Sequence, residues 1–171
     1  MKYWFDTEFI ERGNKYPIEL ISIGIVSEDG RELYRICSDG WDPSHASDWV
    51  TENVISKLED KDTGFWKTRN EIVEEILEFV DKSPEFWASC SDYDWVVFCQ
   101  LFGSMIDLPK NFPMFCMDIQ QLRISFGISK EDLPKQDESS EHNALADAKH
   151  AMRKYKAIYN IAKRYGLINI V

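Results

Sequence analysis

The stretch Lys2-Tyr3-Trp4-Phe5-Asp6-Thr7-Glu8-Phe9 opens the chain and decides how the rest of the sequence can be interpreted. Its first four residues are mostly aromatic, which favours a buried β-strand that runs directly into Asp6. Because side chains alternate along a strand, Asp6 and Glu8 are expected on the same side of the backbone. An unpaired carboxylate beside an apolar strand is costly to bury, and bound cations would offset that cost. A solvated strand end is the alternative for this pair taken alone.

Two more strands are predicted immediately after this stretch. Residues 18–26 are rich in β-branched side chains, and residues 31–37 follow the turn Glu28-Asp29-Gly30, where glycine can adopt a positive φ. The chain is therefore expected to begin with three antiparallel strands.

The apolar residues then change to a helical period. Thr68-Arg69-Asn70-Glu71 has the spacing of a capping box and predicts a helix that includes Val80. Further helices are predicted at residues 92–102, 118–126 and 144–165, short strands at 86–90 and 114–117, and a polar loop at 129–141. This order predicts one α/β domain over residues 1–171. Its mixed five-stranded sheet has three antiparallel strands, then two parallel ones, and helices flank it.

Composition limits the class of protein. Hydrophobic residues make up 44% of the 171 residues, which is typical of a folded globular domain. No apolar run reaches the ~20 residues of a membrane span, and the first residues are too short an apolar stretch for a secretory signal, so a cytoplasmic location is expected. Cys37, Cys90, Cys99 and Cys116 lack metal-binding spacing and are expected to be reduced thiols.

The net charge of −10 argues against a long grip on duplex DNA, because Lys and Arg supply that affinity. It does not argue against an enzyme that holds a few nucleotides at a metal centre, since bound cations reverse the local charge of an acidic site.

Two further carboxylates are candidates for the same site as Asp6 and Glu8. Asp94 lies where the strand at 86–90 gives way to a helix, and strand carboxyl ends are where ligands collect in parallel sheets. Asp92 competes with it but suits a helix cap. Asp147 follows His142 by five residues, which places them on different faces of an ideal helix. The two are compatible if His142 precedes the helix and Asp147 lies in its second turn.

Together these residues suit one kind of chemistry. Four carboxylates form an all-oxygen cage of the type that Mg²⁺ or Mn²⁺ prefers. His142 adds a base that titrates near neutral pH. The set predicts metal-assisted hydrolysis of a phosphodiester.

In this order, the motifs resemble those of the DnaQ-like 3′–5′ exonucleases of the DEDDh class, which have a ribonuclease H-like fold. Asp6-Thr7-Glu8 looks like the first motif, Tyr93-Asp94 like the second, and His142-x-Ala-x-x-Asp147 like the third. Within the class, the chain is similar to a small exoribonuclease family of mycobacteria, other bacteria and phages. The stretches that carry this similarity are residues 3–11, residues 18–24 and Cys99-Gln100-Leu101-Phe102-Gly103.

The resemblance implies a mechanism with two divalent metal ions, Mg²⁺ or Mn²⁺. Asp6 would bridge ions about 4 Å apart, and Glu8, Asp94 and Asp147 would complete their coordination. His142 would act as the general base, and the product would be a nucleoside 5′-monophosphate.

The chain departs from the class at two places that help hold the terminal nucleotide in relatives. Ser89-Cys90 stands where many members have His-Asn, and Phe9-Ile10 replaces a Thr-Gly pair after the first motif. Thr7, Phe9 and Ile10 are the candidate substrate contacts, by stacking on or wedging beside the last base. A core role for Phe9 and Ile10 is the alternative.

The expected substrate is single-stranded RNA or an RNA 3′ end. A 3′–5′ DNA exonuclease of the same class is the nearest alternative, and a non-catalytic nucleic-acid-binding module is another. Relatives in the class are commonly homodimers, so the resemblance implies a homodimer as one arrangement. The basic residues of the last helix are interpreted as a solvated face in preference to a guide for the substrate strand. They are Lys149, Arg153, Lys154, Lys156, Lys163 and Arg164.

Overall fold

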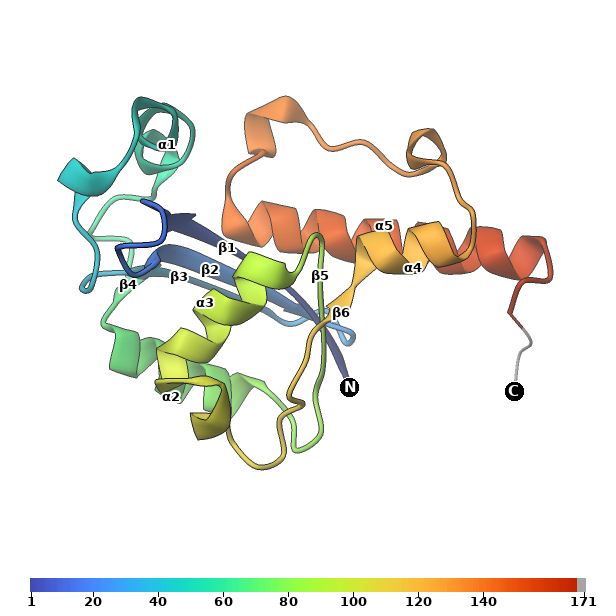
Figure 1. The fold of residues 1–171 in the computed structure, drawn as a ribbon, viewed down its shortest axis with the longest axis horizontal. Helices are drawn as coiled ribbons and strands as arrows, with labels where there is room; N and C mark the ends of the chain where they lie inside the picture. The colour runs from blue at the N-terminus through green and yellow to red at the C-terminus, as the bar shows by residue number, and fades with distance from the viewer. Residues whose placement is uncertain (169–171) are drawn as a thin grey trace.

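A six-stranded mixed sheet forms the centre of the molecule in the computed structural model, which describes residues 1–168 (Figure 1). The strand order is β4-β3-β2-β1-β5-β6. The strands are β1 (Lys2–Ile10), β2 (Glu19–Ser27), β3 (Glu32–Cys37), β4 (Trp66–Lys67), β5 (Glu85–Ala88) and β6 (Met117–Asp118). β1, β2 and β3 are antiparallel, whereas β5 and β6 run parallel to β1. The predicted α/β class and the arrangement of the five strands are confirmed.

The sheet differs from the prediction at its two edges. β4, only two residues long, pairs with β3 in parallel and makes a sixth strand that was not predicted. The last strand begins at Met117 and not at Met114, because Met114 and Phe115 are 51% and 61% exposed outside the sheet. β1 is longer than its aromatic start suggested and continues through both carboxylates to Ile10.

The helices agree closely with the predicted segments. They are α1 (Asp48–Asn53), α2 (Arg69–Phe79), α3 (Asp92–Phe102), α4 (Ile119–Ser125) and α5 (Ala144–Arg164). Thr68 and Glu71 form the predicted capping box at the start of α2. Short 3₁₀ turns lie at Pro43–His45, Ile55–Lys57, Met105–Asp107, Lys130–Asp132 and Glu138–Ser140. α1 was not predicted. No helix within residues 1–168 is long and apolar enough for a membrane span.

Alternation along β1 assigns each face of the sheet to its own helices (Figure 1). Tyr3 and Phe5 pack in a cluster with the apolar residues of α2 and α3. Trp4 points the other way and packs against Tyr155 of α5, with ring centroids 5.1 Å apart. Asp6 and Glu8 follow Trp4 by two and four residues, so both carboxylates face the side that α5 covers.

Gly24 brings the start of α5 onto this face. It is the cross-strand partner of Asp6 in β2. A Cβ at Gly24 would lie 2.3 Å from Leu145 N and 2.4 Å from Ala144 O, both backbone atoms of the first turn of α5. The missing side chain therefore lets the helix begin directly beside Asp6.

Replacing Gly24 with alanine should destabilise the protein and reduce its activity together. The new methyl group meets backbone and not a movable side chain, so α5 must shift away from β2. Overpacking of this kind costs about 1–3 kcal/mol, which is roughly 2–12 °C in melting temperature for a domain of this size. Thermal unfolding checks the first effect and an RNA cleavage assay the second. A Gly24→Ala protein with an unchanged melting temperature would contradict the close contact.

Candidate active site

The first two carboxylates of the site come from β1. Asp6 is partly exposed, and Glu8 is only 9% exposed. Both lie within the regular pairing of β1 with β2, and the register shifts only after Glu8. The sheet backbone therefore fixes the positions of both side chains.

Asp94 is held against the free edge of β1. β5 pairs with Lys2, Tyr3 and Trp4 alone, so the edge of β1 beyond Trp4 has no strand beside it. Asp94, the third residue of α3, takes that place: its Oδ1 accepts hydrogen bonds from Thr7 N (2.9 Å) and Thr7 Oγ1 (2.6 Å). Asp94 is 7% exposed whereas Asp92 is exposed, which favours Asp94 over its competitor.

The hydrogen bonds between Thr7 and Asp94 also indicate the role of Thr7. Its side chain was expected to contact the substrate, but it is 5% exposed and its hydroxyl is bonded to Asp94. Thr7 points to the face opposite Asp6 and Glu8. We therefore interpret Thr7 as a residue that positions Asp94.

His142 and Asp147 lie at the start of α5. Asn143 caps the helix through its side chain, which accepts a hydrogen bond from Ala146 N (3.1 Å). His142 lies just before the cap, as its spacing to Asp147 predicted, and has φ +63°. Its backbone N–H donates a hydrogen bond to Asp147 Oδ2 (3.0 Å). Asp147 lies in the first turn of the helix and not in the second. Gln136 donates to its other oxygen.

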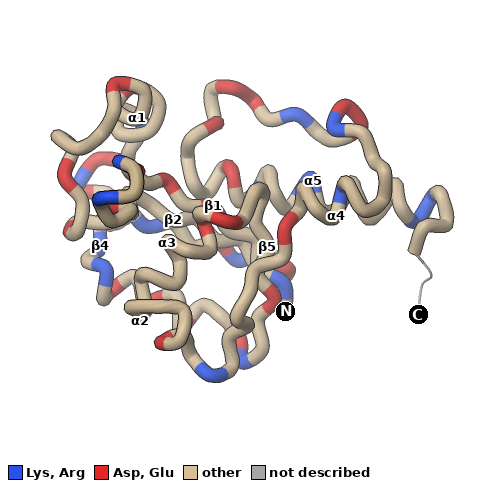
Figure 2. The backbone as a smooth tube through the Cα atoms, viewed as in Figure 1, with Lys and Arg blue, Asp and Glu red and all other residues tan. Residues whose placement is uncertain are grey.

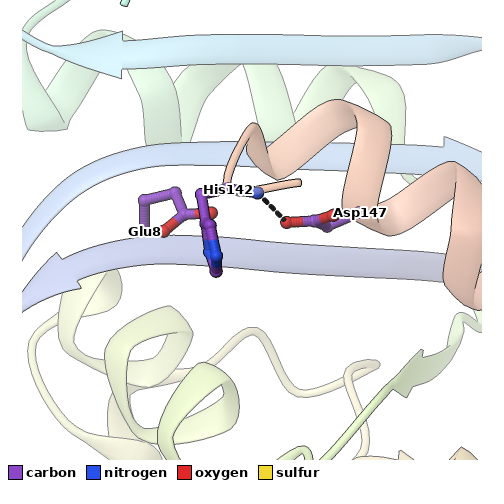
Figure 3. A group of neighbouring side chains, drawn as sticks. All are labelled: Glu8, His142 and Asp147. Atoms are coloured by element: carbon purple, nitrogen blue, oxygen red, sulfur yellow. Dashed lines mark hydrogen bonds between the residues drawn. The ribbon is translucent and has the colours of Figure 1, made fainter. Parts of the chain in front are cut away.

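Residues from the two ends of the chain meet at this point (Figure 3). Glu8 of β1, His142 and Asp147 each offer one ligand atom, and these atoms all lie within 4.8 Å of one another. The charges of Asp94, Glu8 and Asp147 all act on Asp6, so the four carboxylates are neighbours. Glu8, His142 and Asp147 therefore form one compact group, and Asp6 and Asp94 lie within range of its charges.

Burial and mutual repulsion make it unfavourable for all four carboxyl groups to be ionised at once. Burial raises the pKa of Asp6 well above its ordinary value, and Asp94, Glu8 and Asp147 raise it further. Burial and the same repulsion raise the pKa of Glu8 to about 8. The pKa of Asp94 rises to about 6, because burial outweighs the two hydrogen bonds from Thr7. Bound divalent cations would remove the cause of these shifts.

The metal-free protein should lose stability as the pH rises from 6.5 to 8. Glu8 is ionised in the unfolded chain over this interval but holds its proton in the fold, where its pKa is about 8. The folded state then binds more protons, so the free energy of unfolding falls as pH rises. His150, whose pKa burial lowers to about 4 from 6.5, opposes this only weakly, because its imidazole in the unfolded chain is already about half deprotonated at pH 6.5.

Melting temperatures in EDTA and in Mg²⁺ at the two pH values check this expectation. Mg²⁺ should restore stability at pH 8 by binding the folded state. Glu8→Gln should flatten the dependence on pH in EDTA. Equal melting temperatures at both pH values in EDTA would contradict the mutual repulsion.

The structure adds neighbours that the sequence motifs did not indicate. Trp49 of α1 packs edge-on against the His142 imidazole, with ring centroids 4.7 Å apart. Lys57 Nζ donates to Glu141 O (2.9 Å), which ties the segment after α1 to the residue before His142. No pattern in the nearby sequence predicts either contact, because the two residues of each contact are more than 80 positions apart in the sequence.

The two residues after the first motif have different surroundings. Phe9 is partly buried and stacks on Tyr93, with centroids 5.7 Å apart and planes at 11°. Tyr93 is 51% exposed, so the pair presents an aromatic surface beside Asp94. Ile10 is 1% exposed in a cluster with Ile21 and Val54. For Ile10 the structure supports the core role and leaves no surface for a substrate.

A cavity of about 630 Å³ borders the group on the α5 side. His142 and Asp147 line one end of it, and Lys154 of α5 also lines it. Its other wall is the loop of residues 130–141, which arches over α4 and α5 in Figure 1.

Comparisons with known proteins agree on one family. The family model for the 3′–5′ exoribonuclease Rv2179c-like domain matches residues 1–159, a range that includes all five residues of the group. Two proteins of Mycobacterium tuberculosis are each 39% identical to the chain over 162 residues. They are the 3′–5′ exoribonuclease Rv2179c of strain ATCC 25618 / H37Rv and the 3′–5′ exoribonuclease MT2234.1 of strain CDC 1551 / Oshkosh. Each alignment covers 92% of this chain and 93% of the relative.

Proposed function

This chain belongs to the 3′–5′ exoribonuclease Rv2179c-like domain family, and from that premise we propose that it is a metal-dependent enzyme that degrades RNA from the 3′ end. It is a 3′–5′ exonuclease. The observation that supports the metal-dependent mechanism is that ligand atoms of Glu8, His142 and Asp147 lie within 4.8 Å of one another, while the charges of Asp94, Glu8 and Asp147 act on Asp6. We also place it in the DEDDh class, whose five residues correspond to Asp6, Glu8, Asp94, Asp147 and His142.

The carboxylates suit two divalent cations, Mg²⁺ or Mn²⁺. Partial or complete burial raises the pKa of each of the four, and repulsion between neighbouring carboxylates adds to this. Bound positive charge would remove both effects. Carboxylate oxygens are also the ligands that these ions prefer. When bound, the ions supply the charge that activates water and offsets the charge on the phosphate. Asp6, Glu8, Asp94 and Asp147 would hold them.

His142 would accept the proton of the attacking water. As the water oxygen bonds to phosphorus, the bond from phosphorus to the 3′ oxygen of the preceding nucleotide breaks. The terminal nucleotide leaves as a nucleoside 5′-monophosphate, and the shortened strand keeps a 3′ hydroxyl. The hydrogen bond from the His142 N–H to Asp147 holds the His142 backbone next to this carboxylate and does not involve either ring nitrogen.

Phe9 and Tyr93 would form the platform for the last base. Their stacked rings lie beside Asp94, and Tyr93 has an exposed face. Stacking tolerates any base, which suits an enzyme that removes nucleotides in succession. The acidic and basic residues are interspersed along the described chain (Figure 2), and the net charge is −10. This charge distribution suits an enzyme that contacts only a few nucleotides of its substrate.

The test uses matched 5′-end-labelled RNA and DNA oligonucleotides with Mg²⁺, Mn²⁺ or EDTA. RNA should shorten one nucleotide at a time in the presence of metal and stay intact in EDTA. A 3′-phosphorylated RNA serves as the control, because it lacks the free 3′ end. Faster cleavage of DNA than of RNA would favour the DNA exonuclease alternative. Binding without cleavage in every metal would favour the non-catalytic module.

A further inference from the structure

Lys154 lies on the same face of α5 as Asp147. Asp147, His150 and Lys154 are separated by three and four residues, which places them along one side of the helix, and all three line the 630 Å³ cavity. Side chains of a helix lean toward its N-terminus, so Lys154 extends back toward Asp147. The cavity therefore joins the carboxylate group to a cation two turns further along α5.

The contacts of Lys154 hold its ammonium group in place but leave it without a negative partner. Its Nζ donates a hydrogen bond to Ser89 Oγ (3.0 Å), and Gln120 Nε2 donates to the same oxygen (3.3 Å). Within residues 1–168, the ion pairs of the protein do not include Lys154. Lys154 is partly buried, and the more of a lysine that is withdrawn from water, the more rarely it lacks a paired charge.

The charge of Lys154 nevertheless reaches the site. Burial lowers the pKa of Lys154, while Cys90, Asp147 and Asp6 raise it. In return, Lys154 lowers the pKa of Asp6. The ammonium group is thus close to two carboxylates of the site but bonded to neither, and an anion could lie between them.

We propose that Lys154, oriented by Ser89, binds a non-bridging oxygen of the phosphate that is cleaved. This inference rests on the proposed function. A phosphate held by cations on Asp6 and Asp147 must lie beside both residues, and Lys154 is the cation whose charge acts on both. Lysine binds phosphate as a point charge. Its contribution grows as negative charge builds on the phosphoryl oxygens, so Lys154 is a catalytic residue.

The test compares Lys154→Gln with Lys156→Gln, an exposed lysine on the same helix. Binding of AMP and of adenosine is measured by calorimetry in Mg²⁺, because the two probes differ only in the phosphate. Lys154→Gln should weaken AMP binding by about tenfold or more, equal to about 1.4 kcal/mol, and leave adenosine binding unchanged. Its kcat for RNA should fall by a larger factor, and Lys154→Arg should recover part of both losses. Lys156→Gln should match the wild type.

Two results would overturn the assignment. The first is wild-type affinity of Lys154→Gln for both AMP and adenosine, whether or not the metal-free variant is less stable. The second is an equal loss of affinity for both probes, which would mean that Lys154 is structural. A wild-type protein that cleaves no RNA would refute the proposed function instead, and the AMP comparison would still decide the role of Lys154.

Discussion

Replacing Asp6 with asparagine should abolish RNA cleavage and at the same time raise the thermal stability of the metal-free protein. The charges of Asp94, Glu8 and Asp147 all act on Asp6, which is one of the four proposed metal ligands. Loss of charge stabilisation by the metals costs several kcal/mol, which corresponds to about 10³-fold or more in rate. Removing one of four clustered charges relieves repulsion, so the fold itself should gain.

The two effects are measured separately. Single-turnover cleavage of labelled RNA gives the rate, and thermal unfolding in EDTA gives the stability. Asp92→Asn is the matched control, because Asp92 is an exposed acid two residues before Asp94 and should keep normal activity. If Asp6→Asn loses stability along with activity, Asp6 has a structural role and the assignment of the group is wrong.

Replacing His142 with alanine should lower the rate by about 10²–10⁴-fold at neutral pH, the range that general-base assistance typically supplies. Metal affinity should stay nearly unchanged, because the four carboxylates are the proposed ligands. The variant should recover part of its rate at higher pH, as hydroxide replaces the missing base. The wild-type rate should rise with pH over the interval in which imidazoles lose their proton.

Rates across pH and metal titrations by calorimetry decide between the roles of His142. His45→Ala is the control, since His45 pairs with Glu19 and is not part of the group. Near-normal turnover of His142→Ala at neutral pH would mean that another group is the base. A collapse of metal affinity would make His142 a ligand, an arrangement that its closeness to Glu8 and Asp147 also permits.

The sequence predicted the parts of the site that depend on local patterns. Alternation along β1 placed Asp6 and Glu8 on one face, and the helix from Asp92 to Phe102 begins and ends where expected. The position of His142 before the helix followed from its spacing to Asp147. Each of these depends on backbone periodicity, which a sequence records directly.

What the sequence could not predict depends on contacts between distant segments. Thr7 donates a hydrogen bond to Asp94 because β5 ends before it reaches the part of β1 that contains Thr7. No sequence pattern near Thr7 predicts how long β5 is. Ile10 is a core residue because it meets Val54, from a segment with no predicted element. Lys154 was grouped with the solvated lysines of α5, although helical spacing from Asp147 could have separated it from them.

The packing of α5 against β1 and β2 also implies a time at which the proposed active site can first form. Asp6 and Glu8 of β1 precede His142 and Asp147 in the sequence, so a ribosome makes them first. A nascent chain that has not yet released α5 from the ribosome holds only part of the metal-binding group. By the proposed mechanism, such a chain should not cleave the messenger RNA from which it is being translated. A truncated chain of residues 1–141 should accordingly show no nuclease activity, and activity in that fragment would refute this dependence.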